Sequence, residues 1–165
     1  MKLFRLTQIL IVLGFLVLPV SLHSTTLPQS APNIGVNGSA TPKKVKRGRT
    51  ARATIVMDIP GGYHVHSNKP LEKFLIATQL IVDAPQGVRI GPIMYPRAQV
   101  RSLKFSKNKV AVFEGKTTIR FNVTVPANYS SNNLELKARL RYQSCNNEVC
   151  FPPQNRDESI WLNVE

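Results

Sequence analysis

Residues 134–142 read LELKARLRY, a stretch in which apolar and charged side chains alternate without interruption. Apolar residues occupy every second position, and glutamate, lysine or arginine stands between them. A period of two places successive side chains on opposite faces of an extended chain, so the stretch predicts a β-strand with one buried face. We expect the charged face to lie in water, as is common in antiparallel sheets.

Further strand-like stretches follow one another along the rest of the chain. Three of them alternate in the same way, and two shorter apolar runs add further strands. They are residues 50–59, 118–125 and 160–164, with the shorter runs at 74–82 and 110–113. Turn sequences rich in proline, glycine and asparagine separate these stretches. Several short strands with a turn about every ten residues predict an all-β fold, an antiparallel β-sandwich in a single domain.

The N-terminal segment has the features of a secretory signal peptide. An apolar run at residues 9–20 follows the basic residues Lys2 and Arg5. The run is too short and too close to the terminus for a typical membrane span, so we expect residues 1–24 to direct export. The alternative is an uncleaved N-terminal anchor. In both cases the body of the protein is expected in the periplasm or another compartment outside the cytosol.

The remaining sequence divides into two parts. Residues 25–42 are rich in Ser, Thr, Pro, Asn and Gly, which predicts a flexible leader. Residues 43–165 are long enough for one domain with a single hydrophobic core, and we expect the β-sandwich there.

The chain is strongly basic, with a formal net charge of +13. The densest basic run is residues 43–49, and a second group lies within residues 97–109. A basic exported domain can lie on an anionic membrane or steer toward acidic partners, although a role in solubility is the simplest interpretation. Nucleic acid is not an expected partner, because no aromatic stacking platform accompanies the basic run.

Both cysteines of the chain, Cys145 and Cys150, lie in the segment YQSCNNEVCFPPQ at residues 142–154. Two cysteines in an exported protein normally pair, and a lone pair in a small domain is usually structural. A ring this short, however, contributes only about 2 kcal/mol through loop entropy, against roughly 4–5 kcal/mol for a long loop. The double proline at residues 152–153 cannot donate hydrogen bonds to a sheet, so we expect an accessible hairpin tip at a sheet edge. A structural disulfide and a redox-active one both remain open on these grounds.

The cysteine segment closely resembles the redox site of the N-terminal periplasmic domain of DsbD, a bacterial thiol:disulfide interchange reductase. Residues 62–67, GYHVHS, resemble that family's G-Y-x-x-Y-type strand, and residues 92–115 resemble its segment leading through a cap loop. The resemblance covers residues 43–165. It implies an immunoglobulin-like β-sandwich, in agreement with the strand pattern.

The resemblance implies an exported thiol–disulfide exchange module, a component of a protein-disulfide reductase. Such a module relays reducing equivalents to or from thioredoxin-like proteins, disulfide isomerases or cytochrome c maturation factors, without a metal or an organic cofactor. It implies that Cys150 forms the mixed disulfide with a partner and that Cys145 resolves it. No membrane or thioredoxin domain follows the β-domain in this sequence, so either the relay is divided over several polypeptides, with a separate membrane protein delivering the electrons, or the domain serves another task. The alternative is a non-catalytic immunoglobulin-like binding module whose disulfide ties a hairpin.

Six further residues are expected to line the disulfide: Tyr63, His64, His66, Phe105, Tyr142 and Phe151. By resemblance, His64 and His66 occupy the positions of the family's tyrosines, where an imidazole could stabilise a thiolate or deliver a proton to it. The alternative is a pair of solvated strand histidines. A metal site built from these histidines and the two thiols is not expected, because oxidised cysteines cannot ligate zinc.

Two of these aromatic residues have expected roles at the surface of the site. Phe105 lies in a basic stretch and is our choice for the aromatic residue of the family's cap loop, which shields the disulfide until a partner arrives. The alternative is a core phenylalanine at the start of a strand. Phe151 begins an apolar, rigid shoulder with the prolines at 152–153, against which a partner could pack.

Overall fold

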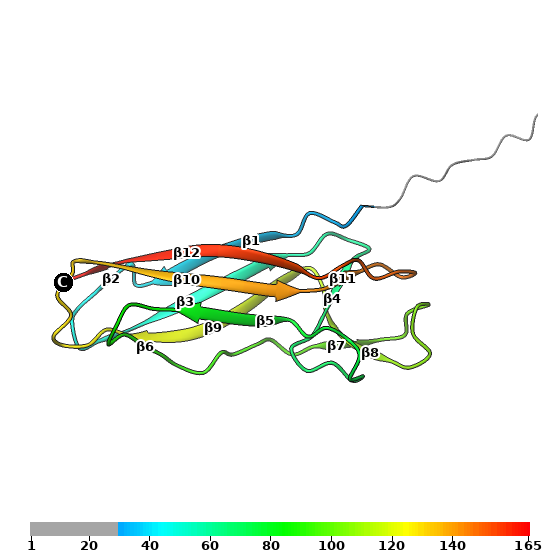
Figure 1. Ribbon diagram of the computed structural model, residues 1–165, viewed down its shortest axis with the longest axis horizontal. Coiled ribbons are helices and arrows are strands. Elements are labelled where there is room, and N and C mark those ends of the chain that lie inside the picture. Colours follow the sequence, from blue (N-terminus) through cyan, green and yellow to red (C-terminus); the bar gives the residue numbers. More distant parts are fainter. Residues whose placement is uncertain (1–29) are drawn as a thin grey trace, which may run out of the picture.

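The computed structural model describes residues 30–165, which form strands, turns and loops and contain no helix (Figure 1). The signal peptide predicted for residues 1–24 lies outside the described residues. Within residues 30–165, no helix is long and apolar enough to span a membrane. The strands are β1 (Gly35–Thr41), β2 (Lys44–Val45), β3 (Thr50–Asp58), β4 (His64–His66), β5 (Gln79–Asp83), β6 (Arg89–Ile90), β7 (Gln99–Arg101), β8 (Val110–Phe113), β9 (Lys116–Thr124), β10 (Asn133–Tyr142), β11 (Ser144–Cys145) and β12 (Gln154–Val164).

The described strands form an immunoglobulin-like, antiparallel β-sandwich, as the sequence predicts. One sheet has the order β1-β3-β9-β6, and the facing sheet has the order β2-β12-β10-β5. A third, smaller sheet of order β11-β4-β8-β7 lies at the end of the sandwich away from the C-terminus (Figure 1). The pairing of β2 with β12 is parallel, and the other strand pairings are antiparallel.

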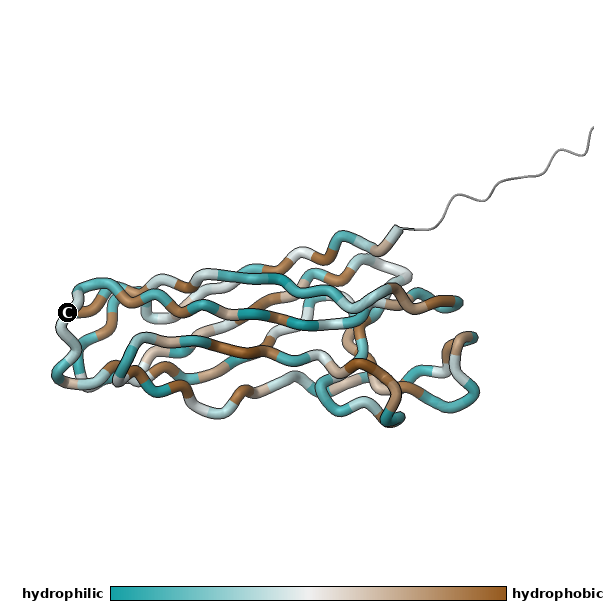
Figure 2. The backbone as a smooth tube through the Cα atoms, in the orientation of Figure 1, coloured by the Kyte–Doolittle hydropathy of each residue, from teal (hydrophilic) through white to brown (hydrophobic). Residues whose placement is uncertain are grey.

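The alternating stretches bury one face each. Along β10, every second side chain from Leu134 to Tyr142 is buried, and the charged residues between them are mostly exposed. The strand pairs with β12 over its whole length and with β5 on its other edge. The hydropathy colouring of Figure 2 alternates along β10, and along β12 only over its C-terminal part from Ile160. The main core lies between the two large sheets, where these buried faces meet.

The expectation of a flexible leader through residue 42 is wrong for the part that the structure describes. Residues 35–41 form β1, an edge strand that pairs with β3 from Gly35 opposite Asp58 to Thr41 opposite Arg52. Ile34, just before it, is buried. The sequence of this strand lacks the alternation of large apolar and polar residues, because the strand packs through small residues. A Cβ atom at Gly38 would lie 2.7 Å from Cγ1 of Ile160 on the facing sheet.

Two predicted strand boundaries also need correction. The run at residues 74–82 is a strand only from Gln79, and Phe74 lies in the preceding loop with 72% of its surface exposed. At the other end of the chain, pairing with β10 resumes directly after the prolines, with Gln154 opposite Tyr142, rather than near residue 160. The β10–β12 hairpin is therefore long, and the cysteine segment forms its tip.

The third sheet brings distant parts of the chain to this tip. Strand β11 pairs with β4, so that Cys145 lies opposite His64 and Ser144 opposite Val65. On its other edge β4 pairs with β8, which pairs with β7. We call the connection between β7 and β8, residues 102–109, the cap loop. The sheet thus carries the disulfide on one edge and the cap loop on the other.

Candidate redox site

A disulfide joins Cys145 to Cys150 across the hairpin tip, with the two Cα atoms 4.0 Å apart. The tip is held by its own hydrogen bonds. The Asn146 side-chain oxygen accepts from the backbone N–H groups of Glu148 and Val149, each at 2.8 Å. Such a side-chain-capped turn is local, which explains why so short a segment can present two cysteines in a fixed geometry.

The two cysteines differ in accessibility. Cys145 is fully buried, and Cys150 is half-buried. The neighbouring residues Asn147, Glu148 and Val149 are exposed. Another molecule can therefore approach the disulfide from the side of Cys150.

A buried imidazole lies against both sulfurs. His66 Nε2 lies 3.5 Å from Cys145 Sγ and 3.9 Å from Cys150 Sγ. The residue has no exposed surface, and His64 is only 4% exposed. The alternative of two solvated histidines is therefore wrong. His66, rather than His64, is the imidazole that contacts the disulfide.

Burial keeps both imidazoles neutral at pH 7. It lowers the pKa of His64 to about 4, with a further lowering from the nearby His66 and an opposing effect of Glu114. Burial also lowers the pKa of His66, and the backbone of Ile76 opposes that effect. Three buried polar atoms here have no well-formed hydrogen bond within residues 30–165: His64 Nε2, His66 Nδ1 and Ser144 Oγ. Buried polar groups without a well-formed hydrogen bond are costly, and they are found more often at functional sites than elsewhere.

Phe105 lies over the two histidines. Its ring centroid is 6.0 Å from that of His64, nearly parallel at 17°, and 6.3 Å from that of His66. The ring is half-buried and packs with Leu103 against a small apolar cluster of Leu75, Val110 and Val112. This cluster is separate from the main core, so Phe105 is not a core residue of the sandwich.

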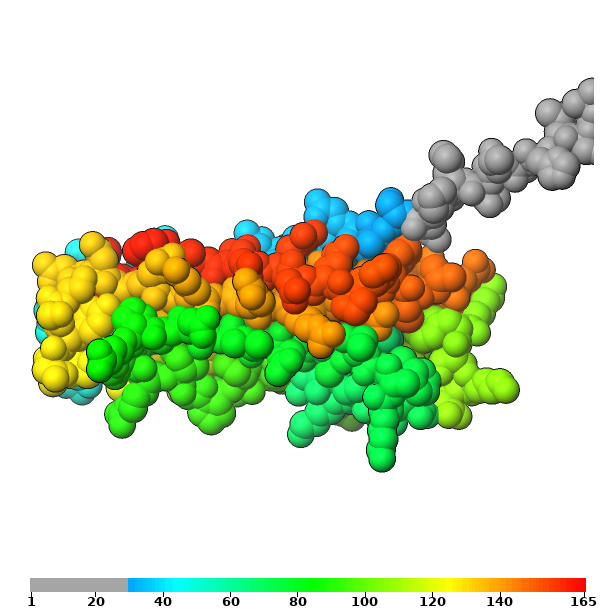
Figure 3. Space-filling model, in the orientation of Figure 1, coloured from blue at the N-terminus to red at the C-terminus, as the bar shows by residue number. Residues whose placement is uncertain are grey.

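Polar contacts join the cap loop to the hairpin tip. The backbone N–H of Lys104 donates to the carbonyl of Asn147 at 3.0 Å, and Lys104 Nζ lies 3.2 Å from a carboxylate oxygen of Glu148. Figure 3 shows the two segments meeting at one end of the molecule. On the other side of the loop, Asn108 donates to Glu72 at 2.7 Å. These contacts could not be predicted from local sequence, because each joins segments more than thirty residues apart.

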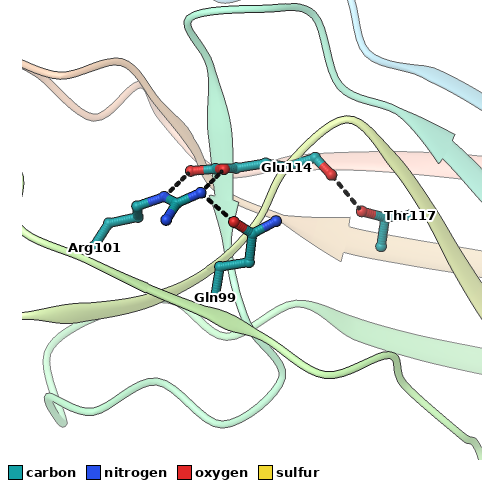
Figure 4. A network of polar contacts seen from close by, with 4 residues as sticks. All are labelled: Gln99, Arg101, Glu114 and Thr117. Carbon is teal, nitrogen blue, oxygen red and sulfur yellow. Dashed lines mark hydrogen bonds and ion pairs between the residues drawn. The ribbon is translucent and has the colours of Figure 1, made fainter.

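An ion pair links Arg101, the last residue of β7, to Glu114, the residue that follows β8 (Figure 4). Arg101 donates from two nitrogens to the Glu114 carboxylate, at 2.9 and 2.7 Å, and also donates to Gln99. The Thr117 hydroxyl donates to the Glu114 carbonyl at 3.4 Å. Hydrogen bonding from Arg101 lowers the pKa of Glu114 and, in turn, raises that of Arg101. Sequence analysis missed this pair, because no pattern in the sequence shows that Arg101 in β7 meets Glu114, the residue after β8.

The other predicted lining residues fall into two groups. Phe151 is buried beside Cys150, and its ring lies 6.1 Å from that of Tyr63. Tyr63 also packs against the main core, so these two residues connect the hairpin tip to the sandwich. Tyr142 is instead fully buried in the main core, where its hydroxyl donates to Gln154 at 3.0 Å. Tyr142 therefore supports the strand that leads to Cys145.

Taken together, the sandwich and the cystine at its end define a class of protein: an immunoglobulin-like β-domain with a thiol–disulfide site. The model of one family, described as thiol:disulfide interchange protein DsbD, N-terminal, matches residues 35–160. The chain belongs to this family of DsbD N-terminal domains. Family membership and the paired cysteines support thiol–disulfide exchange in general.

Solved structures of low identity resemble the chain. The reduced N-terminal domain of Neisseria meningitidis DsbD is 18% identical, with a TM-score of 0.45, over 67% of this chain and 77% of that one. The N-terminal periplasmic domain of ScsB from Proteus mirabilis is 12% identical, with a TM-score of 0.48, over 79% of this chain and 45% of that one. The chain thus spans less than half of the ScsB structure. None of the curated proteins compared with the chain matches it.

Proposed function

We propose that this chain is an exported thiol–disulfide exchange module, which passes reducing equivalents to or from thioredoxin-like proteins through Cys145 and Cys150. The observation that carries the proposal is a disulfide open on one side and contacted on the other by the buried His66. Exchange requires access for an attacking thiolate and stabilisation of the thiolate that leaves. A disulfide that only ties a hairpin requires neither.

In the proposed reaction, a partner thiolate attacks Sγ of Cys150, the half-exposed sulfur. A bond forms between the partner and Cys150, the bond between the two cysteines breaks, and Cys145 leaves as a thiolate. His66, with its proton on Nε2, donates a hydrogen bond to that thiolate from its present position 3.5 Å away. A second thiolate of the partner then attacks the mixed disulfide and releases Cys150, so that the partner is oxidised and this domain gains two electrons. The reverse sequence reduces a disulfide partner.

The partners that we propose are disulfide isomerases or cytochrome c maturation factors of the periplasm, and a separate membrane protein that supplies the electrons. The ScsB domain is described as periplasmic, which supports the same compartment here. The basic surface adds a second proposal, peripheral contact with anionic lipid. Arg47 of the basic run is partly committed elsewhere, because it donates to the carbonyl of Tyr129 and to the side chain of Asn132.

Cysteine variants test the proposal. Cys145→Ser leaves the half-buried thiol of Cys150 and is expected to trap a mixed disulfide with a thioredoxin-like protein of the same compartment. Cys150→Ser leaves only the buried thiol and is the matched control, which should trap far less. Non-reducing gels of cell extracts, followed by mass spectrometry of the trapped species, provide the measurement. Equal trapping by both variants would refute the assigned roles. No trapping by either would favour the binding module with a structural disulfide.

A further inference from the structure

The groups around the disulfide contain three atoms that can ligate a metal ion. His66 Nε2 and the sulfurs of Cys145 and Cys150 all lie within 4.8 Å of one another. In the oxidised protein the two sulfurs are bonded to each other and are poor ligands. In the reduced protein they become two thiolates beside an imidazole. Two thiolates and one imidazole form a ligand set that Zn²⁺ prefers.

We propose that the reduced site binds Zn²⁺ through His66 Nε2, Cys145 Sγ and Cys150 Sγ, and that the bound ion blocks exchange until it is removed. The blocking role rests on the proposed exchange function. On binding, two thiols lose their protons, the His66 proton moves from Nε2 to Nδ1, and two sulfur–zinc bonds and one nitrogen–zinc bond form, without any change of oxidation state. Oxidation to the disulfide consumes both sulfurs and releases the ion. The site is thus open to zinc in one redox state only.

The distances favour this arrangement. Zinc–sulfur bonds of about 2.3 Å and a zinc–nitrogen bond of about 2.0 Å place a tetrahedral pair of nitrogen and sulfur ligands about 3.5 Å apart. The nitrogen of His66 already lies 3.5 Å from one sulfur and 3.9 Å from the other. Two sulfur ligands of zinc lie about 3.8 Å apart. Reduction must therefore separate the sulfurs, whereas the imidazole is already in place.

The surroundings of His66 suit a metal ligand. A ligating histidine commonly presents its second nitrogen to a carbonyl or a carboxylate, which fixes the ring. Nδ1 of His66 has no well-formed hydrogen bond within residues 30–165. The backbone of Ile76 is near enough to raise the pKa of this imidazole, and it is the polar group that could orient the ring through its second nitrogen. Thr78 holds the strand from the other side, because its hydroxyl donates to the His66 carbonyl.

The fourth zinc position is left for water or a small ligand. Among the described residues, the three ligands form the only metal-ligating group of this kind. The half-buried Cys150 gives a route of entry from solvent. Three protein ligands with an open fourth position are the arrangement of catalytic rather than structural zinc sites.

Metal titration of the full exported chain tests the site. The protein is reduced with dithiothreitol, desalted without oxygen, and titrated with Cd²⁺, whose thiolate charge-transfer absorption reports sulfur ligation. Zn²⁺ affinity is measured by competition with a chromophoric chelator. We expect one ion per reduced chain and none per oxidised chain. No binding by the reduced protein would overturn the site.

Two histidine variants separate ligation from folding. His66→Ala is expected to weaken Zn²⁺ binding at least about tenfold. His64→Phe is the matched control, because it removes an imidazole two residues away and keeps an aromatic ring beneath Phe105. Circular dichroism verifies that each variant is folded. If the native protein and His66→Ala bind Zn²⁺ with equal affinity, His66 is not a ligand. If the variant does not fold, the thiolate absorption of the native protein with Cd²⁺ still tests the site.

The blocking role has its own readout. The rate at which the reduced protein reacts with a chromogenic aromatic disulfide is measured under three conditions: without metal, with Zn²⁺, and with Zn²⁺ followed by excess EDTA. We expect the reaction to slow at least about tenfold with Zn²⁺ and to recover with EDTA, because a metal-bound thiolate is a weaker nucleophile. Unchanged rates despite bound zinc would overturn the blocking role. The protein is reduced chemically here, so the metal titration does not depend on a partner protein. If no metal binds, the cysteine-trapping result still stands, and if no partner is trapped, the metal titration can still be interpreted.

Discussion

The ring of Phe105 separates two buried histidines from solvent. It stacks on His64 and tilts against His66, whose Nε2 in turn contacts both sulfurs. The ring belongs to a loop that is anchored to the rest of the protein mainly through Leu103 and a few polar contacts. Access to the disulfide therefore depends in part on a side chain held by modest interactions.

We expect Phe105→Ala to speed the reduction of the disulfide by a small thiol. Aromatic packing of this kind contributes about 1 kcal/mol, and its loss corresponds to a roughly fivefold faster reaction if the loop must open first. Phe74→Ala, at a ring that is 72% exposed, is the control and should leave the rate unchanged. Alkylation of the released thiols at timed intervals gives the rates. Identical rates for native protein and Phe105→Ala would mean that Phe105 covers the histidines but not the sulfurs.

Strand β1 extends the sandwich by packing very closely against the facing sheet. Its small residues allow the strand to approach Ile160 of β12, and Gly38 marks the point of closest approach. A residue without a side chain is needed there for space.

Replacement of Gly38 by alanine should destabilise the domain. The new Cβ would lie 2.7 Å from Cγ1 of Ile160, so that the side chain or the strand must shift, at a cost of about 1–3 kcal/mol. Gly35→Ala in the same strand is the matched control, because its nearest neighbour, Cβ of Asp58, lies at 3.5 Å. Urea unfolding followed by circular dichroism measures both variants. Similar stability of the two would argue against the close packing of β1.

The β7–β8 hairpin carries the cap loop, and an ion pair joins Arg101 at the end of β7 to Glu114 just after β8 (Figure 4). Because Arg101 lowers the pKa of Glu114, the pair stabilises the folded state at any pH above the normal glutamate pKa of 4.5. That contribution disappears as the pH falls through the lowered pKa and the carboxylate becomes protonated.

Arg101→Gln should therefore be less stable than the native protein at pH 7, and the difference should shrink at an acidic pH at which Glu114 is protonated, below its lowered pKa. Glu114→Gln should behave in the same way, since it removes the other partner. Urea unfolding at the two pH values measures the differences. A gap of equal size at both pH values would show that Arg101 acts through packing rather than through its charge.

In the molecule as a whole, the core that stabilises the fold and the disulfide lie in different places. The main core fills the space between the two large sheets, and the disulfide lies outside it, in the small sheet at one end (Figure 1). A redox site in this position can open and close without disturbing the sandwich.

Reduction of the disulfide is accordingly expected to leave the domain folded. A ring of this length contributes about 2 kcal/mol, which corresponds to a fall in the melting temperature of roughly 5–10 °C. Thermal melts with and without reductant should both be cooperative. The double variant Cys145→Ser, Cys150→Ser should melt as the reduced protein does. Unfolding on reduction at ambient temperature would instead identify the disulfide as a structural staple.

Local sequence was sufficient to predict those elements whose own residues follow a clear pattern. The alternation at residues 134–142 predicted β10, because a period of two assigns each side chain to a face without knowledge of its neighbours. The spacing and flanking residues of Cys145 and Cys150 likewise indicated a hairpin tip, since the turn between them is held by its own side chains. Strand β1 was missed because small residues carry no such pattern.

The choice between the two histidines depended on contacts between distant segments. His66 and Cys145 are 79 positions apart in the sequence, and they meet because β4 pairs with β11 in one particular register. The cover provided by Phe105 depends in the same way on the β7–β8 hairpin folding back over β4. Hydrogen bonds between strands set these registers, and one residue of slip would turn each side chain to the opposite face. The residue types at the site were therefore evident in the chain itself, whereas their partners and their burial were set by the packing of the third sheet.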